Sequence, residues 1–417
     1  MNSLGEEIQE KIKKTESEKR ERIEASPYRA VFHLMPPVGW LNDPNGLCQL
    51  HGVYHVFFQY SPFHVDGGMK AWGHATSNDL ISYTYQGAPL VPDESFDKDG
   101  VYSGCAWVEE DRMHLYYTGN VKEEGEHDYI YSGRGANVIY VSSEDGVHFS
   151  EKELLLTNAD YPAECTNHVR DPKIYKKDGS YYMVLGVILY GNGQGDKGAI
   201  LIYRSEDLKH FSYDHTYTTE ETFGYMWECP DIFELDGKEI LSISPQGLET
   251  LEYRFQNIYQ SGYFIKGTDE FTEWDMGFDF YAPQTFLDET GRRILIGWAG
   301  MPDADYKGRL ETEEWQHLMT IPRELRYADG KILQNPIEEL ENYRKEEILV
   351  ETGEKFSFKN ISLDLTLEAK KLSGRLFISD ECVVECKEDE ISLSFSGESG
   401  AGRKQRKAKV TEIHKLR

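Results

Sequence analysis

Ser77-Asn78-Asp79-Leu80-Ile81-Ser82-Tyr83 is the stretch that decides the fold, because the chain repeats it. Related heptads follow as Ser143-Glu144-Asp145-Gly146-Val147-His148-Phe149, Ser205-Glu206-Asp207-Leu208-Lys209-His210-Phe211 and, more loosely, Thr268-Asp269-Glu270-Phe271-Thr272-Glu273-Trp274. The heptads begin at residues 77, 143, 205 and 268, so they lie 66, 62 and 63 residues apart. A Ser-x-Asp turn followed by an aromatic residue suits a corner between two strands.

Strand-like runs fill the sequence between these corners. They are Tyr54–Tyr60, His114–Thr118, Tyr181–Leu189, Ala199–Tyr203, Ile240–Ser244 and Arg293–Trp298. A period near 63 residues with several strands per unit is typical of β-propeller blades. Residues 28 to 335 hold about five such units, so the sequence predicts a five-bladed propeller over 28–335.

The regions on either side of the repeats have different patterns. Residues 5 to 25 are highly charged, with Glu10–Lys14 and Glu18–Arg22 at helix-supporting spacing, so segment 1–27 is predicted to be a solvated helix that packs loosely on the fold. Beyond residue 345 the runs Ile361–Leu367 and Ile391–Phe395 alternate strictly between apolar and polar residues. This alternation predicts a second, all-β domain over 345–417, a β-sandwich. The expected fold class is therefore all-β with an N-terminal helix.

Composition excludes several classes of function. The net charge of −28 argues against nucleic acid and anionic membranes as partners, and the basic run Arg403–Lys407 is expected to be a solvated loop. The six cysteines form no CxxC pair and no zinc-type spacing, so we expect reduced thiols and neither a metal nor a cofactor. No apolar leader precedes the repeats, and no apolar run is long enough to span a bilayer, so a cytoplasmic location is predicted.

Three acidic motifs carry the predicted chemistry: Trp40-Leu41-Asn42-Asp43-Pro44-Asn45-Gly46, Arg170-Asp171-Pro172 and Trp227-Glu228-Cys229-Pro230. Asp43 and Asp171 each lie 34 residues before the corner of their repeat, and Glu228 lies 40 before its own. Equivalent positions on innermost strands face the channel of a propeller, so the three carboxylates should converge there. A retaining glycosidase needs two carboxyl groups about 5–5.5 Å apart. Aromatic and amide side chains that suit a sugar lie near the same strands: Trp40, Asn42, Gln59, Trp72, Trp227 and Trp298.

At these residues the chain resembles the family 32 glycoside hydrolases, which include invertases, sucrose-6-phosphate hydrolases and fructan hydrolases. Besides the acidic motifs, the resemblance rests on Phe58-Gln59-Tyr60-Ser61-Pro62-Phe63, Trp72-Gly73-His74, Tyr102-Ser103-Gly104, Tyr281-Ala282-Pro283-Gln284, Gly297-Trp298 and Ile321-Pro322-Arg323-Glu324-Leu325, in that order. The family has a five-bladed propeller followed by a β-sandwich. The resemblance therefore implies the same fold as the repeats do.

The resemblance also implies a role for each site residue. Asp43 is expected to be the nucleophile, Glu228 the acid/base, and Asp171 the residue that stabilises the transition state. The residues expected to bind the fructosyl unit are Trp40, Asn42, Gln59, Trp72, Tyr102, Ser103, Arg170, Tyr281 and Trp298. The expected substrate is a small fructoside, sucrose or sucrose 6-phosphate.

Other functions remain open at this level. One is a fructan hydrolase or a fructosyl transferase that passes the sugar to another acceptor. Another is a carbohydrate-binding protein without catalysis, and a third is a five-bladed glycosidase acting on arabinan or xylan. The asparagine in the nucleophile motif beside Trp40 argues against the third.

The resemblance has one departure. Family members continue for several strands beyond the segment that resembles residues 402–417, whereas this sequence stops at Arg417. The sandwich is therefore expected to be incomplete. An incomplete sheet leaves an unpaired edge, through which self-association is expected.

Overall fold

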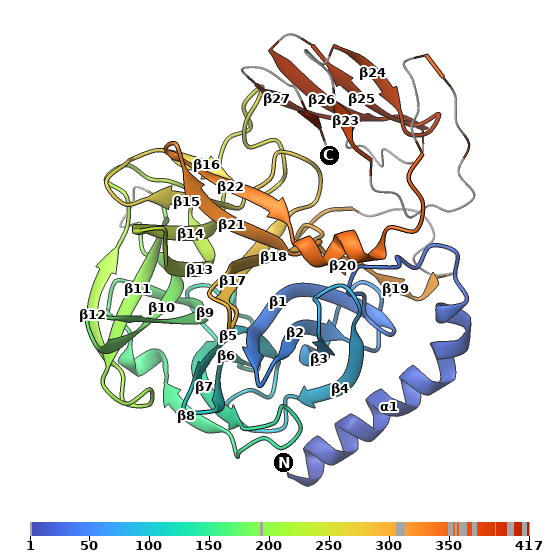
Figure 1. Ribbon diagram of the computed structural model, residues 1–417. Coiled ribbons are helices and arrows are strands. Elements are labelled where there is room, and N and C mark those ends of the chain that lie inside the picture. The colour runs from blue at the N-terminus through green and yellow to red at the C-terminus, as the bar shows by residue number, and fades with distance from the viewer. Residues whose placement is uncertain are drawn as a thin grey trace.

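The computed structural model consists mainly of strands, with one long helix at the N-terminus (Figure 1). The structure describes residues 2–191, 195–305, 313–348, 353–354, 357, 365–368, 373–387, 389–397, 404–410 and 415–416. Within these ranges, no helix has the length and apolar character that crossing a bilayer requires. The predicted all-β fold class with an N-terminal helix is confirmed.

Five antiparallel sheets follow one another along the chain. The first contains β1 (Gly39–Leu50), β2 (Val53–Ser61), β3 (Ala71–Ser77) and β4 (Thr84–Leu90), and the second β5 (Val101–Glu109), β6 (Arg112–Lys122), β7 (Arg134–Ser143) and β8 (Glu153–Leu156). The third contains β9 (Cys165–Lys177), β10 (Ser180–Leu189), β11 (Lys197–Ser205) and β12 (Ser212–Tyr217), and the fourth β13 (Met226–Leu235), β14 (Lys238–Gln246), β15 (Gly262–Ile265) and β16 (Phe271–Glu273). The fifth contains β17 (Tyr281–Leu287), β18 (Arg293–Ala299), β20 (Leu318–Met319), β21 (Arg323–Ala328) and β22 (Lys331–Pro336).

The five sheets are the blades of a closed propeller (Figure 1). Their first strands contact one another in a ring, in the order β1, β5, β9, β13, β17 and back to β1. The ring is also fastened by β19 (Trp315–Gln316), which follows the fifth blade's β18 in sequence but pairs in parallel with β1 of the first blade. The predicted five blades are therefore present.

The repeated heptads make the same corner in three blades, between the third and fourth strands. In the first, the Ser77 hydroxyl accepts a hydrogen bond from the Leu80 N–H at 2.8 Å, and Asp79 Oδ1 accepts from the Ile81 N–H at 2.9 Å. The Ser143 and Ser205 corners make the same kinds of bonds. These side chains satisfy backbone donors that leave the strand ladder, which explains why the Ser-x-Asp pattern recurs.

The N-terminal helix α1 (Ser3–Glu24) is docked on the first blade, so the prediction of a loosely packed, solvated helix is wrong. Ile12 and Ile23 are buried in the same core as strand residues of that blade. Glu16 accepts hydrogen bonds from two tyrosine hydroxyls, Tyr60 at 2.8 Å and Tyr85 at 2.7 Å. The sequence did not predict this docking, because Ile12, Glu16 and Ile23 are only three inward-facing residues among many exposed, charged ones.

After the 3-10 helix η2 (Glu338–Tyr343) the chain forms two further sheets. One has the order β24 (Gly374–Phe377), β25 (Cys382–Cys386), β26 (Glu390–Phe395), β27 (Gln405–Lys409), and the other pairs β23 (Leu367–Glu368) with β28 (Lys415–Leu416). The predicted strand Ile391–Phe395 is β26, whereas residues 361–364 of the other predicted run lie outside the described residues. The prediction of a solvated loop at Arg403–Lys407 is wrong from Gln405 onward. That part is strand β27, and Arg406 is buried against the Phe278 ring.

Candidate active site

All five innermost strands break register at the same level of the propeller. The shifts lie between Leu41 and Pro44, Val101 and Gly104, Arg170 and Lys173, Glu228 and Asp231, and Tyr281 and Gln284. A β-bulge bends the strand and re-aims its side chains, and bulges are common beside active sites. In the last three blades Asp171, Cys229 and Ala282 have φ angles of 60°, 47° and 47°, each followed by a proline. Proline lacks an N–H, so it fits a position where the ladder is interrupted.

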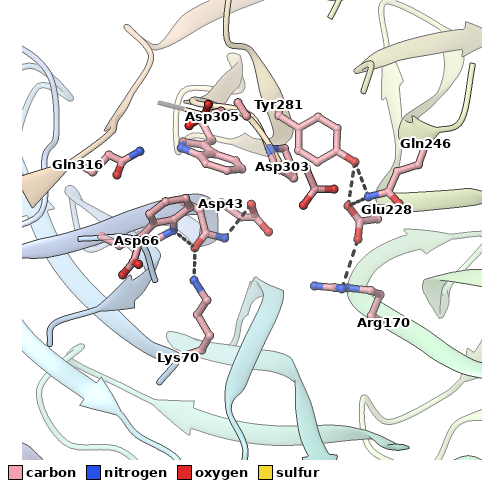
Figure 2. Close-up of a pocket in the computed structure, with 15 residues that line it drawn as sticks. Asp43, Asp66, Lys70, Arg170, Glu228, Gln246, Tyr281, Asp303, Asp305 and Gln316 are labelled. Carbon is pink, nitrogen blue, oxygen red and sulfur yellow. Dashed lines mark hydrogen bonds and ion pairs between the residues drawn. The ribbon is translucent and has the colours of Figure 1, made fainter. Parts of the chain in front are cut away.

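A pocket of about 610 Å³ opens at this level. It is lined by Trp40, Asn42, Asp43, Asp66, Lys70, Arg170, Glu228, Gln246, Tyr281, Trp298, Pro302, Asp303, Ala304, Asp305 and Gln316. Figure 2 shows Asp43 and Glu228 on strands from different blades, facing the same space. The structure thus brings two of the three predicted catalytic carboxyl groups to one cavity.

Asp43 is 7% exposed and lies on β1. The Ser103 hydroxyl of the neighbouring blade donates to its Oδ2, and Asn42 Nδ2 donates to its Oδ1 at 3.1 Å. Burial and the nearby Asp171 raise the pKa of the Asp43 carboxyl, while these two hydrogen bonds oppose the shift because they stabilise the carboxylate. Asp43 is therefore held in one orientation by donors from two blades.

Glu228, on β13, has different surroundings. Its Oε2 accepts hydrogen bonds from the Tyr281 hydroxyl at 2.8 Å and from Gln246 Nε2 at 2.9 Å, and its Oε1 lies 3.3 Å from Arg170 Nη1. Burial raises the pKa of Glu228 to about 7, against the opposing charge of Arg170. A carboxyl group with this pKa can both donate and accept a proton at neutral pH.

Asp171, on β9, is 2% exposed and is not among the residues that line the pocket. Its Oδ2 accepts a hydrogen bond from the Cys229 N–H at 3.0 Å, and its Oδ1 accepts from Arg170 Nε at 3.1 Å. Cys229 Sγ lies 3.5 Å from Asp171 Oδ2 and 3.9 Å from Asp43 Oδ2. Cys229 therefore lies between two of the acidic residues; it stands in the third acidic motif, but no role in the site was predicted for it.

The residues predicted to bind the sugar fall into two groups. Asn42, Arg170, Tyr281 and the indoles of Trp40 and Trp298, whose ring centres are 5.8 Å apart, line the pocket. The second group is not among the lining residues: Gln59, Trp72, Tyr102 and Ser103.

Residues of this second group connect the first two blades. Trp72 Nε1 donates to the Tyr102 carbonyl at 2.9 Å, and Gln59 Nε2 donates to the Val101 carbonyl at 2.6 Å. The Tyr102 ring also lies 5.2 Å from the Arg170 guanidinium. These contacts hold β5 in place, so that Ser103 reaches Asp43.

Several lining residues were not predicted, because they lie outside the acidic motifs. They are Asp66, Lys70, Gln246, Pro302, Asp303, Ala304, Asp305 and Gln316. Most of them lie in loops, where the spacing of residues along the sequence does not predict which side chains face the pocket. Lys70 was the most accessible to prediction, since it stands two residues before Trp72. Among the described residues, no three His, Cys, Asp or Glu side chains are grouped to hold a metal ion.

Comparison with known proteins gives consistent matches. The family model for the N-terminal domain of glycosyl hydrolases family 32 matches residues 33–336. The chain is 42% identical over 349 residues to a sucrose-6-phosphate hydrolase of Bacillus subtilis, covering 80% of this chain and 70% of that protein. It is 38% identical over 329 residues to a raffinose invertase of Escherichia coli, covering 76% and 66%.

Solved structures agree with these relatives. The structure of a sucrose-6-phosphate hydrolase from Lactobacillus gasseri superposes with a TM-score of 0.79 at 26% identity, over 97% of this chain and 86% of that one. A mutant of a Bombyx mori family 32 β-fructofuranosidase in complex with sucrose gives a TM-score of 0.78 at 28% identity, over the same shares of the two chains.

Proposed function

Because the chain belongs to glycosyl hydrolase family 32, we propose that it is a retaining β-fructofuranosidase that cleaves the terminal β-D-fructofuranosyl unit of sucrose or sucrose 6-phosphate. The observation that carries this proposal is the pairing of Asp43 and Glu228 on one pocket. Asp43 is fixed by hydrogen bonds that favour its carboxylate, and Glu228 has a pKa of about 7. Retaining glycosidases require these two roles of their carboxyl groups.

In the first step, the Asp43 carboxylate attacks the anomeric carbon of the fructosyl unit. Glu228 gives its proton to the leaving oxygen, and a covalent fructosyl–Asp43 ester remains. In the second step, Glu228 takes a proton from water, and the resulting hydroxide displaces Asp43 and releases fructose. Glu228 thus ends protonated and Asp43 ionised, as each began.

Asp171 is proposed to stabilise the transition state by binding fructose hydroxyl groups. Its orientation is fixed by Arg170 and by the Cys229 N–H. Arg170 also lies against Glu228, so it balances the charge of both carboxylates. The Trp40 and Trp298 rings, which line the pocket, supply apolar surface for the sugar.

The decisive experiment is hydrolysis of sucrose by the wild type, measured beside Asp43→Ala and Glu228→Ala. We expect release of fructose by the wild type and a loss of at least roughly 10²-fold in kcat for each variant. Wild-type turnover no better than that of the variants, with sugar binding retained, would instead identify a non-catalytic carbohydrate-binding protein. Retention is checked by the anomeric configuration of the first product.

The same assay ranks the substrates. Parallel measurements with sucrose, sucrose 6-phosphate and inulin separate a disaccharide hydrolase from a fructan hydrolase. Fructosylated products at high sucrose concentration would identify a transferase. The relatives named sucrose-6-phosphate hydrolase support the two disaccharides as substrates.

Two further proposals concern the surroundings of the protein. The six cysteines are all free, which supports a reducing compartment such as the cytoplasm, and cell fractionation tests this location. Within the described residues β24 pairs only with β25, and its last residue, Phe377, is 65% exposed. We therefore propose that chains self-associate through β24. Sedimentation velocity should show a larger species for the wild type than for Phe377→Lys, and identical sedimentation would refute the interface.

A further inference from the structure

Lys70 lines the pocket and is the residue immediately before β3. Its carbonyl accepts a hydrogen bond from the Val101 N–H at 3.0 Å, which ties it to the second blade. Its Nζ donates to Asn42 Oδ1 at 3.0 Å and lies 5.2 Å from the centre of the Trp40 ring (Figure 2). The ammonium group is thus directed at the residue that precedes the nucleophile.

The chemistry of its neighbours determines how the Asn42 amide is turned. Trp40 Nε1 donates to the same Oδ1 at 2.8 Å. An indole N–H and an ammonium group can only donate, so the amide oxygen must face Trp40 and Lys70. The amide nitrogen is then left to face Asp43, where it donates to Oδ1 at 3.1 Å.

Building on the proposed function, we propose that Lys70 is a positioning residue for the nucleophile Asp43. It acts through Asn42, whose amide it holds with the nitrogen directed at the attacking carboxylate, and it adds a positive charge close to that carboxylate. Without Lys70, a single hydrogen bond from Trp40 would hold the amide, and the donor to Asp43 would lose its fixed direction.

Lys70 remains a cation at neutral pH, although it is partly buried. Burial lowers its pKa to about 8, with the Arg170 charge acting in the same direction and the Asp43 carboxylate opposing both. Burial lowers the pKa of His317 to about 3, with the Lys70 charge acting in the same direction, so that ring is neutral and adds no repulsion. Asp66 is a further carboxylate lining the same pocket.

The test replaces Lys70 by Met, which keeps the length of the stem but removes donor and charge, and by Arg, which keeps both. For Lys70→Met we expect kcat on sucrose to fall about tenfold with little change in KM. The acidic limb of its kcat/KM profile should move to higher pH, because Asp43 must be ionised to attack and loses a stabilising cation. In Lys70→Arg the acidic limb of kcat/KM should return to its wild-type pH. Lys14 is exposed and far from the site in sequence, so Lys14→Met should have the kcat and the pH profile of the wild type.

A double-mutant cycle with Asn42→Ala tests the route of the effect. If Lys70 acts through Asn42, the loss in kcat of the double variant is smaller than the product of the two single losses. Multiplying losses, or an acidic limb that stays in place in Lys70→Met, would overturn the proposal. If Lys70→Met does not fold, as judged by its melting temperature, Lys70→Gln takes its place in the cycle.

A readout that needs no activity separates this proposal from the proposed function. The pKa of Asp43, followed by the ¹³C chemical shift of its labelled carboxyl group, should be higher in Lys70→Met than in the wild type. An equal value in both proteins refutes the role of Lys70. A wild type that hydrolyses no fructoside refutes the proposed function, while the comparison of Asp43 titrations still decides about Lys70.

Discussion

At the residue scale, the structure gives neighbouring carboxyl groups different chemistry. Asp43 accepts hydrogen bonds that favour its ionised form, and Glu228 is buried against a tyrosine hydroxyl and an amide. Burial raises the pKa of Glu228 to about 7, although the adjacent Arg170 and the Tyr281 hydrogen bond both act to lower it. This contrast lets one group attack while the other transfers a proton.

The raised pKa of Glu228 predicts the alkaline limb of the pH profile. Glu228 must be protonated to donate to the leaving oxygen, so kcat/KM should fall as the pH rises through about 7. Glu228→Gln should lose roughly 10²–10⁴-fold in kcat on sucrose, because the amide cannot donate the proton. A fructoside with an activated leaving group should recover much of the loss in the first step. Wild-type kcat/KM that is still rising at pH 9 would contradict this assignment.

The sequence predicted individual site residues only where they belong to a recognisable motif. The equal offset of Asp43 and Asp171 identified equivalent points on two blades, and the resemblance supplied the roles. Neither the repeat offset nor the resemblance predicted that Cys229 lies between the carboxylates or that Asp303 lines the pocket. Contacts between blades join residues far apart in the chain and produce no periodic pattern in the sequence.

At the scale of elements, the bulges on the innermost strands explain how side chains reach the axis. A regular strand would direct alternate residues into the blades. The register shifts allow successive residues such as Arg170 and Asp171, or Asn42 and Asp43, to contribute to the same site. Left-handed backbone at non-glycine residues costs of order 1–3 kcal/mol each, so the rigid ring of strands must hold Asp171, Cys229 and Ala282 in place.

The docking of α1 gives a test at this scale. Glu16→Ala would leave the buried hydroxyls of Tyr60 and Tyr85 without their acceptor and should destabilise the fold by about 1–3 kcal/mol. Glu16→Gln keeps an acceptor oxygen and should stay close to the wild type. Burial raises the pKa of Glu16, so its contribution to stability is greatest at low pH and declines as the pH rises through the folded-state pKa.

Urea denaturation of the three proteins measures these differences. Equal stability of Glu16→Ala and the wild type would show that the helix is held by its apolar residues alone. Because stability is the readout, the result does not depend on the substrate.

At the scale of the whole molecule, the β27 sheet is fastened to the propeller by a loop that also reaches the pocket. Arg406 donates to Asn257 Oδ1 at 2.8 and 2.9 Å, and Gln256 bonds both the N–H and the carbonyl of Lys407. In the same loop, the Tyr259 hydroxyl donates to Asp303 at 2.6 Å on the pocket wall. The buried Arg406 thus connects β27 to a loop that contacts the pocket.

The division into 1–27, 28–335 and 345–417 remains a prediction that limited proteolysis can test. Residues 344–348 are exposed and lie outside any strand or helix, so trypsin should cut first at Arg344 or Lys345. The two fragments should elute together in gel filtration, because the contacts of Arg406 and Gln256 persist after the cut. A first cut within the blades would place the boundary elsewhere.

The sequence by itself determined the number of blades, the strands that carry the acidic motifs and the family. It could do so because corners, strand periodicity and motifs are local patterns that repeat along the chain. Only the tertiary structure decided that Ser103 and Asn42 orient Asp43, that Glu228 titrates near neutrality, and that Lys70 faces Asn42. These properties depend on burial and on contacts between blades, which arise only when distant segments close into a ring.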